Sequence, residues 1–177
     1  MKKYEFTGET KEIRLLFRTA TLHRIRATVA FGIVEVGDLG GWIEKEENLS
    51  HEGKAWVWGN AKVCGDAEVW GNAKVCGDAK VWGNAEVCGD AEVFSASHVL
   101  VIGVIGSRND FTTFYRDKDN EITVKCGCFL GKIDRFLEKV TQTHGDSKYA
   151  LVYRAAVEVA KLQIDLSGEA PKDADEE

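Results

Sequence analysis

Arginines in two stretches of the chain are the residues best suited to bind a charged ligand. Arg24 and Arg26 alternate with apolar residues in LHRIRA, and Arg108 lies in GSRN after an apolar run. A guanidinium holds a phosphate or carboxylate through two parallel hydrogen bonds, and backbone N–H groups in such a turn can form an anion-binding nest. We therefore predict that an anionic ligand is bound by Arg24, Arg26, Arg108, Ser107, Asn109 and His144. The alternative is that these arginines pair with nearby carboxylates or cover apolar surface.

Cys126, Cys128 and His144 could supply three ligands to a metal ion. Alternate residues on a strand point to the same side, but the sequence offers no fourth ligand for zinc. The cysteines at 64, 76 and 88 are 12 residues apart and do not form the close pairs of a zinc site. We therefore expect reduced, structural thiols, with no metal and no cofactor. His144 is expected to cap the C-terminal end of a helix.

A six-residue repeat occupies the middle of the chain. From Gly53 to Phe94 the sequence reads GKAWVW, GNAKVC, GDAEVW, GNAKVC, GDAKVW, GNAEVC, GDAEVF, with Gly first, Ala third and Val fifth in each hexad. Alanine and valine two residues apart share one face of an extended segment, and the Gly-Asn and Gly-Asp pairs supply a bend. The repeat predicts a winding array of short strands with small aliphatic side chains inside.

This pattern resembles the hexapeptide-repeat proteins, whose fold is a left-handed parallel β-helix. The resemblance implies that three hexads complete one coil, so that residues 18 apart stack. That family more usually has a small or polar residue after the aliphatic one, where this chain alternates Trp or Phe with Cys. Stacking at 18 then sets each large side chain against a small one. Trp58, Trp70 and Trp82 are expected near the corners, either packed under a flanking segment or forming an oligomer contact or ligand-stacking surface.

The same resemblance bears on catalysis, because many proteins of this fold are trimeric acyltransferases with a histidine base between coils. The histidines of this chain, at positions 23, 51, 98 and 144, all lie outside the hexads. No long loop interrupts the hexads, and the three zinc-binding histidines of carbonic anhydrases of this architecture are missing. We expect no enzymatic activity and keep acyl transfer as an alternative.

The hexads divide the chain into four parts and predict a mainly β fold. Residues 1–52 are expected to form strands, including 4–6 and 15–17, and an irregular cap for the open end of the helix. Residues 53–94 are expected to form the left-handed parallel β-helix that the resemblance implies. Residues 95–166 are expected to be a small α+β domain that ends in amphipathic helices over 131–143 and 148–166. Residues 167–177 are expected to be a disordered acidic tail.

The second of these helices carries an apolar stripe. The residues expected to face inward are Leu151, Val152, Ala155, Val159 and Leu162.

Charge and hydropathy exclude several classes of protein. The chain of 177 residues has 23 Lys+Arg against 29 Asp+Glu, a net charge of −6, whereas binding to duplex nucleic acid needs clustered positive charge. No apolar run approaches the roughly 18 residues that span a bilayer, and the first residues lack the apolar stretch of a secretory signal. We expect a cytoplasmic protein with no membrane and no duplex nucleic acid as partner.

Nearly the whole chain also resembles uncharacterised proteins of bacteriophages and prophages. The segments that carry this likeness are YEFTGET, GDLGGWIEKEENLSHEG, the GNA and GDA hexads, IGSRND, VKCGCF, THGD and KYA. The resemblance implies an accessory phage protein in the host cytoplasm. We expect a non-enzymatic homo-oligomer, a trimer or dimer, that acts as a counter-defence factor. It would sequester a small anionic, nucleotide-like host molecule or block a host protein. A structural or assembly role is the main alternative.

Overall fold

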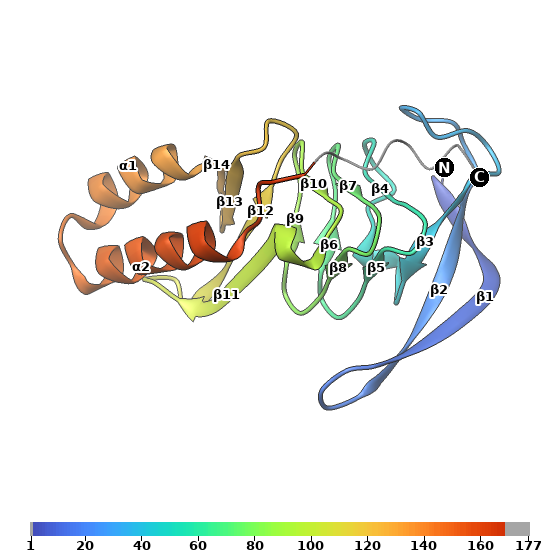
Figure 1. The fold of residues 1–177 in the computed structure, drawn as a ribbon, viewed down its shortest axis with the longest axis horizontal. Helices are drawn as coiled ribbons and strands as arrows, with labels where there is room; N and C mark the ends of the chain where they lie inside the picture. Colours follow the sequence, from blue (N-terminus) through green and yellow to red (C-terminus); the bar gives the residue numbers. More distant parts are fainter. Residues whose placement is uncertain (1, 169–177) are drawn as a thin grey trace.

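Three bodies follow one another along the long axis of the molecule (Figure 1). They are an N-terminal hairpin, a stack of short strands, and a C-terminal sheet with two helices. The structure, a computed structural model, describes residues 2–168. The predicted disordered tail lies outside these residues except for its first two.

The hexads form seven strands of two residues each. These are β4 (Trp56–Val57), β5 (Lys62–Val63), β6 (Glu68–Val69), β7 (Lys74–Val75), β8 (Lys80–Val81), β9 (Glu86–Val87) and β10 (Glu92–Val93). Parallel ladders join strands whose residues are 18 apart, with β7 between β4 and β10, β5 beside β8, and β6 beside β9. If three hexads complete one coil, strands whose residues are 18 apart must lie side by side, as these do. The left-handed parallel β-helix itself stays a prediction.

The interior of this stack is aliphatic. The alanine and the valine of every hexad are at most 2% exposed. The glycine that begins each hexad has a positive φ, between 52° and 75°. Only glycine adopts this conformation without a steric penalty, so the same residue recurs wherever the chain turns from one short strand to the next.

The N-terminal part extends one ladder of the stack. The hairpin strands β1 (Tyr4–Arg14) and β2 (Thr19–Ala27) are antiparallel, and β2 pairs with β3 (Leu39–Ile43). Strand β3 then pairs in parallel with β5, with Ile43 beside Val63. The short 3-10 turn η1 (Glu46–Asn48) follows, and Asn48 Nδ2 donates to the carbonyls of Gly65 and Ala67 at 3.0 and 2.8 Å.

The strand predicted over residues 15–17 is wrong. These residues form the turn between β1 and β2, where Leu16 and Phe17 are 87% and 93% exposed. A run of apolar residues favours a buried strand, but here β1 continues from Tyr4 through polar residues to Arg14 and leaves the apolar run at its tip.

A second sheet and two helices form the C-terminal part. The 3-10 turn η2 (Ala96–His98) leads into an antiparallel sheet in the order β11 (Val99–Ile105), β12 (Asp110–Arg116), β13 (Ile122–Cys126) and β14 (Phe129–Lys132). Helices α1 (Ile133–His144) and α2 (Lys148–Gln163) follow and confirm the two helices predicted. Strand β14 was not predicted, and it delays the start of the first helix to Ile133. None of the described helices is both long and apolar enough to cross a bilayer.

The predicted inward face of α2 is wrong. Its five residues are exposed, and the buried ones are Ala150, Tyr153, Ala156, Val157 and Ala160. Helix α2 carries apolar residues on both faces, so periodicity alone could not select the face that packs on the body. The alanines allow α2 to approach its neighbours closely, and Tyr153 packs edge-on against Phe136 of α1, with ring centroids 5.6 Å apart.

Candidate anion-binding site

The six residues predicted to bind an anion fall into two groups at opposite ends of the molecule. Arg24 and Arg26 lie on β2, in the N-terminal hairpin. Ser107, Arg108 and Asn109 lie in the turn between β11 and β12, and His144 ends α1. These elements are separated along the long axis (Figure 1), so one small ligand cannot contact both groups.

The two arginines of β2 are already paired with carboxylates of β1. Arg24 Nη1 lies 3.2 Å from Glu9 Oε2, and Arg26 Nη2 lies 2.5 Å from Glu5 Oε1. Arg24 also points Nε at the carbonyl of Gly40, 3.4 Å away. This arrangement matches the alternative in which the arginines pair with nearby carboxylates. Their positive charge is therefore compensated within the hairpin.

The second group is brought together by the C-terminal part. Ser107 Oγ lies 3.4 Å from His144 Nε2, and the imidazole stacks on Tyr153 with centroids 5.8 Å apart and an interplanar angle of 28°. The imidazole thus faces the β11–β12 turn, and no hydrogen bond from it to the last carbonyls of α1 is found in residues 2–168. We call Ser107, Arg108, Asn109, His144 and Tyr153 the turn cluster.

Two unusual backbone positions shape this turn. Gly106 has φ 71° and Asn109 has φ 48°, a conformation that asparagine tolerates better than most residues. A β-carbon on Gly106 would lie 2.0 Å from the hydroxyl oxygen of Tyr153. Glycine at this position therefore allows α2 to place its tyrosine directly under the turn.

Arg108 differs from the two arginines of the hairpin. Its side chain crosses the β13–β14 turn, where a β-carbon on Gly127 would lie 2.9 Å from Arg108 Nε. The residue is exposed, and among residues 2–168 no carboxylate forms an ion pair with it. Arg108 thus presents a positive charge that no described carboxylate compensates.

Tyr153 belongs to the cluster although no pattern in the sequence indicated it. Burial raises the pKa of its hydroxyl, so the group stays protonated and able to donate a hydrogen bond. It interacts with Ser107 and with Cys126, and Cys126 Sγ in turn accepts from Thr112 Oγ1 at 3.3 Å. Tyr153 lies on the face of α2 that packs against the sheet. Sequence periodicity selected the opposite face and therefore did not indicate this residue.

The two cysteines at C-x-C spacing do not share a strand face. Cys126 ends β13 and is half-buried, whereas Cys128 lies in the β13–β14 turn and is exposed. Within the described part of the chain, no group of three or more His, Cys, Asp or Glu residues is arranged to hold a metal ion.

The three tryptophans predicted at the corners differ in exposure. Trp58 and Trp70 are half-buried and pack against the core of the hexad stack. Trp82 is 44% exposed, and Lys80 Nζ lies 5.7 Å from its ring centroid. Trp70 also lines an open cavity of about 580 Å³ whose other lining residues include three glutamates, Glu46, Glu47 and Glu68. Those carboxylates would repel an anion.

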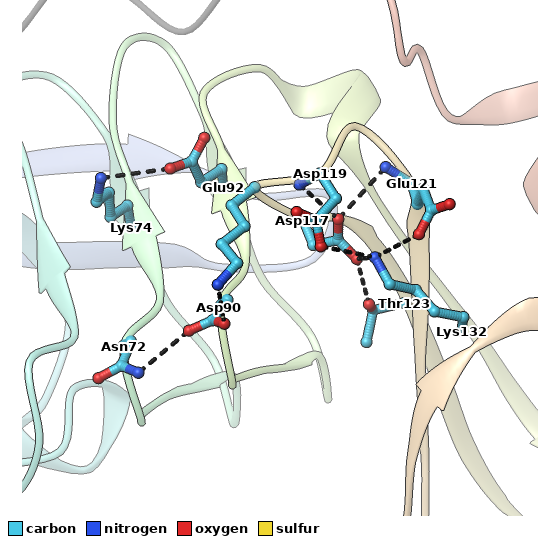
Figure 2. Close-up of polar contacts among 10 residues, drawn as sticks. Asn72, Lys74, Asp90, Glu92, Asp117, Asp119, Glu121, Thr123 and Lys132 are labelled. Atoms are coloured by element: carbon cyan, nitrogen blue, oxygen red, sulfur yellow. Dashed lines mark hydrogen bonds and ion pairs between the residues drawn. The ribbon is translucent and has the colours of Figure 1, made fainter.

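A separate polar network joins the hexad stack to the C-terminal sheet (Figure 2). Asp117 accepts hydrogen bonds of 2.5 Å from both Thr123 Oγ1 and Lys132 Nζ. Lys132 also contacts Asp119 and Glu121, at 3.4 and 2.7 Å. We call Asp117, Asp119, Glu121, Thr123 and Lys132 the Asp117 joint.

Turns of the hexads and the turn between β12 and β13 tie this joint to the stack. Lys118 Nζ lies 2.8 Å from Asp90 Oδ2. Asn72 Nδ2 donates to Asp90 Oδ1 at 3.1 Å (Figure 2). Burial alone would raise the pKa of Asp117, but the hydrogen bonds from Lys132 and Thr123 outweigh it and lower the pKa. Lys132 is shared among three carboxylates, so the joint keeps a net negative charge and would repel an anion. Its contacts hold the two bodies together.

Comparison with known proteins adds no relative, because neither a family model nor a curated protein matches the chain.

Proposed function

We propose that this protein binds a small anionic ligand of the nucleotide type at the turn cluster and does not transform it. The observation that carries the proposal is the exposed guanidinium of Arg108, which no described carboxylate compensates, in the turn where Ser107 Oγ lies 3.4 Å from His144 Nε2. Of the three arginines predicted to bind an anion, it is the one whose charge is still available.

The groups around Arg108 are suited to phosphate oxygens. A guanidinium offers donors in a fork that matches phosphate, and the exposed hydroxyl of Ser107 can donate as well. The backbone N–H of Asn109 donates to the carbonyl of Gly106 at 3.4 Å and closes the turn, so the donors offered to a ligand come from the side chains of Arg108 and Ser107. Hydrogen bonds to a charged group contribute about 1.5–3 kcal/mol each, so a few of them give useful affinity.

Binding without catalysis fits the surroundings of His144. A histidine that activates a serine is usually oriented by a third group, most often a carboxylate. Among residues 2–168, no carboxylate is hydrogen-bonded to His144. Asp146, two residues along the chain, lies 3.5 Å from Arg154 Nη1. The pair of Ser107 and His144 therefore lacks the part that would make it a nucleophile and its base.

The resemblance to phage proteins supports the biological part of the proposal. A protein of this kind would act in the host cytoplasm as a counter-defence factor by sequestering a nucleotide-like host molecule. Blocking a host protein, a role in assembly and acyl transfer are the competing functions.

The test begins with the ligand. The purified full-length protein is incubated with a nucleotide extract, desalted and heat-denatured, and the released molecules are identified by mass spectrometry. Release of an unchanged anionic nucleotide is the expected result. A chemically altered nucleotide would indicate an enzyme, and no nucleotide together with a stable host protein in a pull-down would indicate protein blockade. Either of these two outcomes overturns the proposal.

The second step locates the site. Calorimetry with the released nucleotide compares the Arg108→Ala, Arg24→Ala and Arg26→Ala variants with the parent. We expect Arg108→Ala to weaken binding roughly tenfold or more, because a charge-assisted hydrogen bond is lost. The other two variants serve as matched controls, since their arginines are paired with Glu9 and Glu5. Parent-like binding by Arg108→Ala would exclude the turn cluster as the site.

A further inference from the structure

We propose that the turn between β1 and β2 inserts its two central residues into the surface of a bilayer that contains anionic phospholipid, while lysines beside the hairpin contact the headgroups. We call these two residues, Leu16 and Phe17, the hairpin tip. The contact is independent of the ligand proposed for the turn cluster. The prediction of no membrane partner followed from the lack of a membrane-spanning run and of a secretory signal, and a contact at the bilayer surface requires neither.

The hairpin tip carries two large apolar side chains where a turn usually carries small or polar ones. The N–H of Leu15 donates to the carbonyl of Arg18 at 2.8 Å and closes the turn, so that Leu16 and Phe17 are its central residues. They are 87% and 93% exposed, so neither turn chemistry nor packing within the chain accounts for them. Large apolar side chains that gather on an exposed surface mark a contact with a protein or a membrane.

The hairpin holds its tip clear of the rest of the chain. In Figure 1 the turn between β1 and β2 extends past the turns of the hexads. The base of this turn contacts the stack, because Leu15 and Arg18 line a cavity of about 240 Å³ together with Trp82 and the neighbouring hexad turns. The stack therefore supports the base of the turn and leaves its two central residues free to enter a bilayer.

Three lysines lie on one face of the sheet that the hairpin joins. Trp42 is opposite Lys62 in the ladder of β3 and β5, and Lys62 is opposite Lys80 in the ladder of β5 and β8, so their side chains share a face. Lys11 of β1 reaches this face, since its Nζ lies 4.6 Å from the ring centroid of Trp42. Trp82 adjoins it, with Lys80 Nζ 5.7 Å from its ring centroid. We call Lys11, Lys62, Lys80 and Trp82 the basic face.

The positive charges of the basic face are not paired with carboxylates. Within residues 2–168, none of its three lysines forms an ion pair, whereas the neighbouring Arg18 is paired with Glu44. Burial lowers the pKa of Lys62, and the nearby charges of Lys11 and Lys80 lower it further, although Asp78 acts in the opposite direction. The three ammonium groups are thus close enough to repel one another. An anionic bilayer surface would relieve this repulsion, because it attracts lysines that lie near it.

A bilayer fits these features better than a protein or a nucleic acid does. A specific protein partner needs a pocket of matching shape and roughly 1,200 Å² of buried surface, which a tip of two residues does not supply. Hydrocarbon accepts apolar side chains of any shape, since the hydrophobic effect has no preferred direction. Nucleic-acid surfaces stack bases on aromatic rings, and Leu16 has none. Tryptophan is typical of the headgroup level of a bilayer, which is where Trp82 would lie beside an inserted tip.

The test is flotation of the full chain with vesicles of phosphatidylglycerol and phosphatidylcholine in equal parts, and with vesicles of phosphatidylcholine alone. We expect binding to the anionic vesicles that weakens as salt is added, because salt screens the charges. Phe17→Ser removes an apolar side chain from the hydrocarbon and should weaken binding roughly tenfold or more. Val36→Ser is the control, because Val36 is 66% exposed in the turn before β3, and it should bind like the parent. Both variants should melt like the parent.

The basic face is tested by removing charge. Lys62→Gln combined with Lys80→Gln should weaken binding to the anionic vesicles roughly tenfold and reduce its dependence on salt. Lys139→Gln combined with Lys148→Gln is the matched control, because it changes the net charge equally at two exposed lysines of α1 and α2. This control should bind like the parent.

The outcomes that overturn the proposal differ from those that concern the turn cluster. Failure to float with either kind of vesicle would exclude the bilayer, and binding of single-stranded RNA in its place would indicate a nucleic-acid surface. Equal binding to the two kinds of vesicle would exclude the part assigned to the lysines. Binding that Phe17→Ser leaves unchanged would exclude insertion of the hairpin tip. None of these results would alter the binding of a nucleotide at Arg108.

Discussion

The hydroxyl oxygen of Tyr153 occupies the space that a β-carbon on Gly106 would need, with 2.0 Å between the two positions. This contact fixes α2 against the β11–β12 turn and brings the aromatic ring under His144, with which it stacks. The geometry of the turn cluster therefore depends on the missing side chain of one glycine.

Replacing Gly106 by alanine should destabilise the protein by about 2–4 kcal/mol, because the new methyl group adds a clash to a strained positive φ. Thermal unfolding followed by circular dichroism measures the loss. Gly83→Ala is the matched control, since Gly83 has φ 67° and no atom within 4 Å of the added carbon. Equal losses in the two variants would mean that Tyr153 does not press on the turn.

Replacing Val75 by aspartate should abolish cooperative unfolding or cost more than about 4 kcal/mol, because a carboxylate would be buried without a partner. Val75 lies in the middle of a ladder, between Val57 and Val93, and is fully buried. Val36→Asp is the control at an exposed valine. An unchanged melting curve for Val75→Asp would contradict the stacking of the hexads.

The Asp117 joint should weaken in acid. The folded state lowers the pKa of Asp117, so the unfolded chain binds a proton more readily. The stabilisation is therefore present above the ordinary aspartate range and is lost as the pH falls through the lowered pKa. Denaturant unfolding between about pH 7 and pH 3, a range that spans the ordinary aspartate pKa, should show this loss.

The matching variants separate this carboxylate from its neighbours. Asp117→Asn should cost about 2–4 kcal/mol at neutral pH and flatten the acid dependence, because one partner of a buried charge pair is removed. Asp119→Asn makes the same chemical change at an exposed position and should alter little. If Asp117→Asn keeps the acid dependence of the parent, the joint is not its source.

The cysteines should react at different rates with a chromogenic disulfide reagent. Cys128 is exposed and should react first, whereas burial raises the pKa of Cys64 and Cys88 and removes the reactive thiolate. Stopped-flow absorbance should show a fast phase that Cys128→Ser removes and Cys64→Ser leaves intact. All five cysteines should react in denaturant. A fast phase that survives Cys128→Ser would contradict the placement of that residue in an open turn.

The sequence predicted those features that depend on local repetition. The hexads indicated buried alanines and valines and turns at glycine, because each unit of six residues repeats the same conformational demands. It also predicted the existence of α1 and α2. It could not predict the face of α2, since apolar residues recur at helical spacing on both of its faces. It also could not predict the turn at Leu16 and Phe17, whose apolar side chains favour burial.

Of the candidate site, the sequence predicted the part that depends on local structure. Ser107, Arg108 and Asn109 are neighbours in the chain, so their proximity needed no tertiary structure. Their approach to His144 depends on how α1 is placed against the sheet. The pairing of Arg24 and Arg26 with Glu9 and Glu5 depends on the register of β1 and β2, which alternation alone does not fix.

The ladders of the hexads set a regular spacing between the two ends of the molecule. Each ladder joins residues 18 apart, and adjacent strands of a sheet are about 4.8 Å apart. Inserting or deleting 18 residues would therefore move the N-terminal hairpin relative to Arg108 by about one strand spacing and return the chain to the same side. Changes of six or twelve residues would also turn one end relative to the other. Variants with more or fewer hexads thus give separate control over the distance and the orientation between the two ends of the protein.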